Sequence, residues 1–90
     1  MKKHYRIRVS GRVQGVFFRA STRDKARELG VSGWVKNEEG NSVLISAEGT
    51  EEALRSLLDW CKKGSPLAKV NSVNYQEKAL ESHSGFVIIS

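Results

Sequence analysis

The stretch YRIRVSGRVQGVFFRASTRDKARELG, residues 5–30, joins two different hydrophobic patterns through a short corner. Residues 5–13 alternate between polar side chains and positions that are apolar or glycine. This period of two predicts a β-strand with one buried face. Residues 20–29 instead predict a helix. A mainly apolar stripe would run along one side of it, formed by Phe18, Thr22, Ala26 and Leu29. Gly30 stands where a C-terminal helix cap is expected. The two patterns together predict a strand followed directly by a helix.

The remainder of the chain repeats these two kinds of pattern. Residues 32–37 and 42–48 are short β-rich runs, and the EEGN between them has the turn residues of a hairpin. Thr50 is a candidate N-cap for a second helix that ends near Gly64. Its apolar residues recur at helical spacing, at Leu54, Leu57, Leu58 and Cys61. Residues 69–75 and 85–90 are predicted to be the closing strands.

This order of elements predicts an α+β fold. Strand, helix, strand, strand, helix and strand, followed by a short final strand, are most simply joined as two layers. Both helices would lie on one face of a mostly antiparallel sheet, which is the ferredoxin-like split βαβ sandwich. We expect one domain over residues 1–90, because the sequence contains no repeat, linker or low-complexity segment.

The composition, with 39% hydrophobic and 28% charged residues, is that of an ordinary folded, soluble chain. No apolar run approaches the ~18 residues of a membrane span. The N-terminal residues lack the apolar segment of a secretory signal, so we expect a cytoplasmic protein, with a monomer as the default. The single cysteine, Cys61, excludes an internal disulfide. The net charge of +5 favours anionic ligands, but the scattered basic residues do not form a nucleic-acid-binding tail.

The corner VQGVFFR, residues 13–19, has the composition of an anion-binding loop. Backbone N–H groups at a helix N-terminus lack partners within the helix and lie at the positive end of its dipole. Gly15 would let a ligand approach the backbone, and the guanidinium of Arg19 suits phosphate or carboxylate oxygens. The residues alone also allow an ordinary turn, with Arg19 solvated and Phe17 or Phe18 in the core. The phosphate motifs GxxxxGK[ST] and GxGxxG are absent.

GRVQGVFFR (11–19), followed by GWVKN (33–37), resembles the pair of signatures of the acylphosphatase family. The resemblance extends over nearly the whole chain, including GSP at 64–66 and GFVII at 85–89. It implies a small standalone enzyme with the ferredoxin-like fold. It also implies that Arg19 binds a phosphate and that Asn37 positions a water. The backbone amides that would cradle the phosphate are those of Gln14, Gly15, Val16, Phe17 and Phe18.

The resemblance implies that the substrate is a small-molecule acyl phosphate, hydrolysed to a carboxylate and inorganic phosphate. The carboxylate leaves without being protonated, because its conjugate acid has a pKa of about 4. Positioning and electrostatics can then carry the phosphoryl transfer, with the substrate phosphate as the implied proton acceptor and no phosphoenzyme. We expect no cofactor and no metal, since His4 and His83 are isolated in the sequence. Both histidines are predicted to lie at the surface.

Other residues are expected to have supporting or structural roles. Ser42 opens the strand next to Asn37 and is a candidate to orient its carboxamide, while Thr22 is a candidate to support the loop. Cys61 is predicted to be a buried, inert thiol. Packing is the predicted role of the remaining large aromatic residues, Trp34, Trp60 and Tyr75.

Two alternative functions remain on the sequence alone. The first is an RNA-binding module, since RNA-recognition domains share the ferredoxin-like fold and the chain is basic. Adjacent Phe17 and Phe18 oppose it, because RNA-binding strands space their aromatic residues by alternation on a sheet face. The second is a domain of a larger carbamoyl-transfer protein, which the absence of further cysteine pairs opposes. The sequence does not indicate which acyl phosphate is the physiological substrate.

Overall fold

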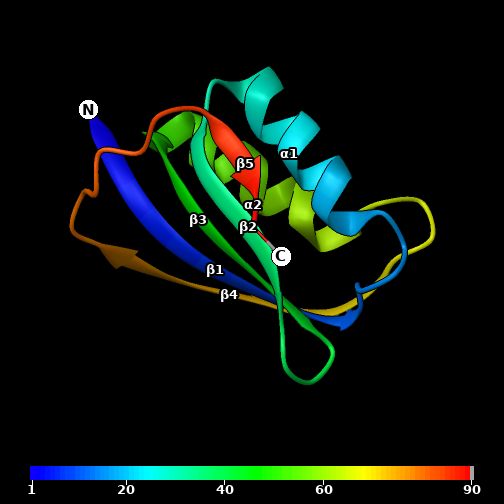
Figure 1. Ribbon diagram of the computed structural model, residues 1–90. Coiled ribbons are helices and arrows are strands. Elements are labelled where there is room, and N and C mark those ends of the chain that lie inside the picture. Colours follow the sequence, from blue (N-terminus) through cyan, green and yellow to red (C-terminus); the bar gives the residue numbers. More distant parts are fainter. Residues whose placement is uncertain (90) are drawn as a thin grey trace.

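The computed structural model describes residues 1–89 and folds them into five strands and two helices (Figure 1). The elements are β1 (Lys2–Arg12), α1 (Phe18–Leu29), β2 (Ser32–Glu38), β3 (Ser42–Thr50), α2 (Glu51–Lys63), β4 (Lys69–Lys78) and β5 (Phe86–Ile88). The sheet has the order β4-β1-β3-β2-β5, and both helices cover one of its faces. The predicted ferredoxin-like α+β sandwich is confirmed. Residue 90, part of the predicted last strand, lies outside the described residues.

The register of the sheet decides which side chains face the helices. Pairing is antiparallel between β1 and β3, β1 and β4, and β2 and β3, whereas β5 runs parallel to β2. Ile45 lies opposite both Ile7 and Val35, and all three side chains are fully buried on the helix side. Alternate residues therefore point to the other face, among them Arg6, Arg8 and Ser46.

The helices bury the apolar stripes that the sequence predicts. Thr50 caps α2 by accepting a hydrogen bond from the N–H of Ala53 at 3.1 Å, and Gly30 caps the C-terminus of α1 with φ of 73°. The buried residues are Phe18, Thr22 and Ala26 in α1, and Leu54, Leu57 and Cys61 in α2. Burial of each leucine contributes about 1.5–3 kcal/mol. Neither described helix combines the length and apolar character required to span a membrane.

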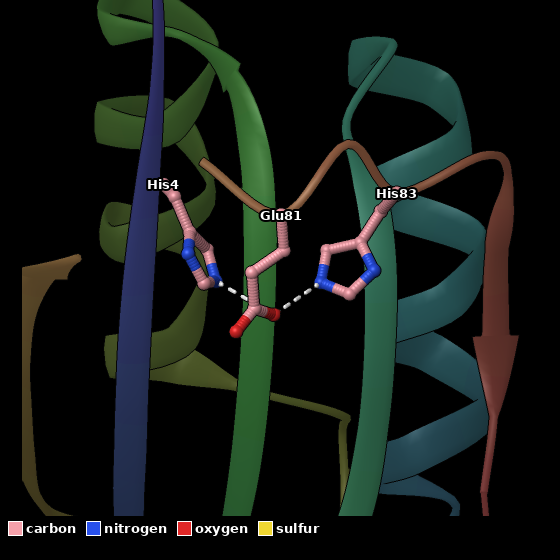
Figure 2. A group of neighbouring side chains, drawn as sticks. All are labelled: His4, Glu81 and His83. Atoms are coloured by element: carbon pink, nitrogen blue, oxygen red, sulfur yellow. Dashed lines mark ion pairs between the residues drawn. The ribbon is translucent and has the colours of Figure 1, made fainter. Parts of the chain in front are cut away.

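The segment between β4 and β5, residues 79–85, connects opposite edges of the sheet and lies over the face that the helices leave open (Figures 1 and 2). It is anchored there by Glu48, whose buried carboxylate accepts the backbone N–H groups of Glu81, Ser82 and His83. We call this segment the crossover. It covers His4, which is completely buried, so the prediction of a surface position for His4 was wrong.

Candidate active site

The loop between β1 and α1 turns sharply because two of its residues have left-handed backbone conformations. These residues are Gly15, with φ of 73°, and Phe17, with φ of 61°. Glycine adopts this conformation readily, whereas for Phe17 it costs about 1–2 kcal/mol. Backbone strain of this kind concentrates at functional sites. A left-handed residue next to a helical one also directs successive N–H groups to one side, where they form an anion-binding nest.

The carbonyl groups at the end of this loop, at residues 16–18, take part in the fold, while the N–H groups of the loop do not. Three carbonyl oxygens accept hydrogen bonds: Val16 from the Ser65 hydroxyl at 2.7 Å, Phe17 from the Ser21 N–H at 3.0 Å, and Phe18 from the Thr22 hydroxyl at 2.8 Å. Within residues 1–89, the backbone N–H groups of residues 14–20 have no hydrogen-bond acceptor. These donors lie at the N-terminus of α1, where the helix dipole is positive. The loop therefore presents a group of free donors to an anion.

Arg19 lies at the edge of this nest, in the first turn of α1. It lines a cavity of about 300 Å³ together with Val13, Gly15, Phe17, Phe18, Ala20 and Ile88. The cavity combines the start of the helix, the loop and the last strand. Its walls are largely apolar, which strengthens the attraction between the guanidinium and an anion.

Asn37 lies on β2 near the same end of the sheet. It follows Val35 by two residues on the helix-covered face, and Val35 pairs with Ile88, a residue that lines the Arg19 cavity. Its Oδ1 atom is buried and has no hydrogen-bond partner among the described residues. A buried carboxamide oxygen without a partner is unusual and is suited to accept a hydrogen bond from a bound water or ligand.

The Gln14 side chain joins the loop to the hairpin that carries Asn37. Its Nε2 atom donates to the carbonyl oxygens of Glu38 at 2.7 Å and Ser42 at 2.8 Å. Both donor positions of the carboxamide are thus used. Gln14 was expected to contribute only its backbone amide. Its side chain holds the loop against the residue that follows Asn37.

Ser42 and Thr22 contact the loop in different ways. Thr22 is buried and supports the Phe18 carbonyl, as described above. Ser42 pairs with Glu38, while Asn37 pairs with Val43, so the side chains of Ser42 and Asn37 point to opposite faces of the sheet. The expected orienting contact of Ser42 with Asn37 is therefore replaced by its main-chain contact with Gln14.

One carboxylate of the hairpin beside the loop, that of Glu38, is paired with a guanidinium. The Nε atom of Arg8 donates to Oε1 of Glu38 at 2.9 Å. This hydrogen bond, together with the attraction of the two charges, raises the pKa of Arg8. The ion pair lies on the open face of the sheet and offsets a negative charge that would otherwise repel an anionic substrate.

Comparison with known proteins identifies the family to which this arrangement corresponds. The sequence model of the acylphosphatase family matches residues 5–88. The chain belongs to the acylphosphatase family. An acylphosphatase of Haloquadratum walsbyi is 52% identical over 80 residues, which make up 89% of this chain and 86% of that relative.

Solved acylphosphatase structures agree with the fold over its whole length. The acylphosphatase from Bacillus subtilis is 44% identical, with a TM-score of 0.95 over 100% of both chains. The acylphosphatase from Coxiella burnetii is 41% identical, with a TM-score of 0.95 over 98% of this chain and 93% of that one. The predicted family is confirmed, and so is the predicted enzyme class, an acylphosphatase-type hydrolase acting on acid anhydrides.

The cysteine and most aromatic residues of this acylphosphatase fold lie where the sequence suggested. Tyr75, for which packing was predicted, is instead 52% exposed, although its ring is stacked on a buried tyrosine ring. Phe18 is buried, with its ring centroid 5.4 Å from that of Trp60, whereas Phe17 is 76% exposed. Neither belongs to a strand, which agrees with the argument against an RNA-binding sheet. Cys61 is buried, and burial raises the pKa of its thiol to about 12. It is therefore protonated and inert at neutral pH.

Sequence reasoning missed a group of side chains at the opposite end of the sheet. His4, Glu81 and His83 place a ligand atom each within 4.8 Å of one another (Figure 2). The prediction that His4 and His83 are isolated was wrong, because the crossover brings His83 over the strand that carries His4. The i, i+2 spacing of Glu81 and His83 was the available signal. Nothing in the local sequence relates this pair to His4, which lies 77 positions before Glu81.

Proposed function

We propose that the protein hydrolyses the carboxyl–phosphate anhydride of small-molecule acyl phosphates, releasing a carboxylate and inorganic phosphate. One observation carries this proposal beyond family membership. In the loop at residues 14–18 the N–H groups are free and the last three carbonyl groups, those of residues 16–18, are engaged by the fold, next to the guanidinium of Arg19. This arrangement suits the several oxygens of a phosphate group.

In the proposed mechanism, the loop amides and Arg19 bind the phosphate oxygens. The amides donate from Gln14, Gly15, Val16, Phe17 and Phe18. A guanidinium offers a planar pair of donors that matches two phosphate oxygens. Because these donors are already oriented by the fold, they stabilise the charge of the transition state with little reorganisation.

Asn37 is proposed to hold the attacking water. The free Oδ1 atom accepts one proton of the water in a hydrogen bond and orients the water oxygen toward phosphorus. Asn37 is neutral and does not remove that proton. A phosphate oxygen of the substrate takes the proton as the bond between water oxygen and phosphorus forms. Because water and not a side chain forms that bond, no phosphoenzyme is made.

The bond between phosphorus and the acyl oxygen breaks in the same displacement, and the carboxylate leaves with the electron pair. No general acid is required for this step, because the conjugate acid of the leaving group has a pKa of about 4. The proposed reaction needs neither metal nor cofactor. Within residues 1–90 we propose a single domain that acts as a monomer in the cytoplasm.

The proposal is tested by measuring benzoyl phosphate hydrolysis in the presence of EDTA. Arg19→Ala is expected to lower kcat/KM by about 10³-fold or more, as for arginines that stabilise transferring phosphoryl groups. Asn37→Ala is expected to lower kcat by about 10²–10³-fold, as when one oriented donor or acceptor is removed. Circular dichroism would confirm that both variants remain folded.

Two surface variants serve as matched controls. Arg23→Ala removes a guanidinium one turn further along α1, where it pairs with Asp24, and Asn74→Ala removes an exposed carboxamide on β4. Both are expected to retain the wild-type rate. Inactive wild type, or loss of activity in EDTA that Mg²⁺ restores, would overturn the proposed mechanism. Equal losses in the control variants would show that the assay reports stability instead of catalysis.

A further inference from the structure

A second constellation of polar side chains lies at the other end of the sheet from the phosphate loop. His4 is at the start of β1, whereas the loop follows the end of β1. The nine residue-to-residue steps from His4 to Val13 span roughly 30 Å of extended chain. The crossover contributes Glu81 and His83 to the same place (Figure 2). This constellation is therefore separate from the site of hydrolysis.

We propose that His4, Glu81 and His83 bind a divalent transition-metal ion, with Zn²⁺ as the best fit. Two imidazoles and one carboxylate form the type of ligand set that zinc accepts, with a water as the fourth ligand. Oε1 of Glu81 lies 3.1 Å from Nε2 of His83 and 3.9 Å from Nε2 of His4. Ligand atoms around a tetrahedral zinc ion lie roughly 3.3 Å apart, so small side-chain adjustments suffice.

The Ser46 hydroxyl lies between the two imidazoles and marks the point on which they converge. Its Oγ atom is 2.7 Å from Nε2 of His4 and 3.0 Å from Nε2 of His83. Metal binding would exchange these hydrogen bonds for coordination bonds. The Nε2 atoms of the two histidines already point toward the same small volume, so this exchange of partners requires little movement (Figure 2).

The tautomer of His4 is set for metal binding. Its Nδ1 atom lies 2.8 Å from the carbonyl oxygen of Ala79, and a carbonyl can only accept a hydrogen bond. Nδ1 of the neutral ring must therefore carry the proton, which leaves a lone pair on Nε2. A backbone carbonyl is one of the usual acceptors for the second ring nitrogen of a metal-ligating histidine.

The crossover is held in the conformation that presents Glu81 and His83. The carboxylate of Glu48 accepts the three successive N–H groups of residues 81–83, and Ser82 between the two ligands has a left-handed φ of 57°. A non-glycine residue in this conformation is sparsely populated and persists only where its surroundings impose it. The two ligands on the crossover are thus oriented before any ion binds.

Access and charge are also consistent with a metal site. The side chain of Glu81 is 47% exposed and that of His83 is 19% exposed, so an ion can enter from solvent, while His4 forms the buried floor. Arg6 lies 3.6 Å from Oε2 of Glu81, which holds that oxygen and leaves Oε1 for the ion. The positive charge of Arg6 weakens the attraction for a cation, so we expect weaker binding than at a site built from thiolates.

A bound ion would join the start of β1 to the crossover and stabilise the fold, because the ligands are assembled only in the native state. It would not take part in hydrolysis, given its distance from Arg19. The experiment is calorimetric titration of the metal-stripped protein with ZnCl₂ at neutral pH, together with thermal unfolding with and without zinc. Wild type is expected to bind one equivalent and to unfold at a higher temperature when zinc is present.

Variants distinguish this site from adventitious binding. His83→Ala and Glu81→Gln keep the buried floor intact and are each expected to lose at least roughly tenfold in zinc affinity, together with the thermal shift. Both are expected to hydrolyse benzoyl phosphate at the wild-type rate. Arg19→Ala is expected to bind zinc as wild type does. Zinc affinity and thermal shift that are unchanged in both His83→Ala and Glu81→Gln, or wild type without saturable binding, would overturn the proposal.

Discussion

The buried carboxylate of Glu48 offers the sharpest test of how the crossover is held on the sheet. Its oxygens accept the backbone N–H groups of Glu81, Ser82 and His83, and the residue is only 3% exposed. Burial acts to raise the pKa of Glu48, but the N–H groups of Glu81 and His83, the charge of His83 and the N–H of Ser82 together lower it below its ordinary value. The ionised form is thus the one that the fold stabilises.

Glu48→Gln preserves the shape of the side chain but turns an NH₂ group toward backbone donors. One oxygen keeps its hydrogen bonds and the other is lost. Each lost hydrogen bond to a charged group contributes about 1.5–3 kcal/mol, and a buried N–H left without a partner costs a further ~1–3 kcal/mol. We therefore expect the free energy of unfolding to fall by about 3–5 kcal/mol, a large part of the ~5–15 kcal/mol of a typical domain.

Urea denaturation measures this loss, and amide hydrogen exchange localises it to residues 81–83. Glu81→Gln is the matched control, because it makes the same chemical change on an exposed side chain and leaves the backbone N–H in place. It is expected to change stability by less than ~1 kcal/mol, as for surface ion pairs. A loss below about 1 kcal/mol in Glu48→Gln, with unchanged exchange at residues 81–83, would refute the anchoring role.

Three further predictions follow from other parts of the fold. Gly33→Ala should lower the free energy of unfolding in urea by more than ~3 kcal/mol, because the new Cβ would lie 1.8 Å from the carbonyl oxygen of Ser46. Gly40→Ala is the control: nothing lies within 4 Å of its new Cβ, so it should lose only ~1–2 kcal/mol. Equal losses in the two variants would contradict this reasoning. The pKa of Cys61 is about 12 in the folded protein against an ordinary 9.0, so between these values only the unfolded state loses the thiol proton. The free energy of unfolding should therefore fall as pH rises above 9, by about 2 kcal/mol at pH ~10.5. This dependence on pH should be smaller in Cys61→Ala. Gln14→Ala should lower kcat for benzoyl phosphate roughly 10- to 100-fold while circular dichroism is unchanged, since the loop loses its link to the hairpin; an unchanged kcat would remove Gln14 from the site.

The start of α1 shows where local sequence signals were insufficient. The helix was predicted to begin at residue 20, and it begins at Phe18, with Phe17 at the N-cap position and no side-chain cap. Sequence rules look for Ser, Thr, Asp or Asn at that position. A capping side chain would occupy the N–H groups that we propose bind phosphate. The local rule therefore fails at the point where the proposed function requires those donors to be free.

The strands, the helices and the phosphate loop could be predicted from the sequence because each depends on residues close together in the chain. Alternation over residues 5–13 and the apolar stripes of the two helices require only the geometry of a strand or a helix. The loop and Arg19 are contiguous, so their proximity follows from connectivity. Asn37 was placed beside them only through the resemblance to a family.

The surroundings of His4, Glu48 and Asn37 were decided by tertiary structure alone. The alternation of side chains along β1 assigns His4 to the same face of the sheet as Arg6. Local sequence reasoning treats that face as exposed to solvent. That face is covered at one end because the crossover lies across it, and Glu48 fixes the crossover through backbone contacts 33–35 residues away in sequence. Contacts of this range depend on the path of the whole chain and on the loops it closes, which no local pattern of side chains encodes.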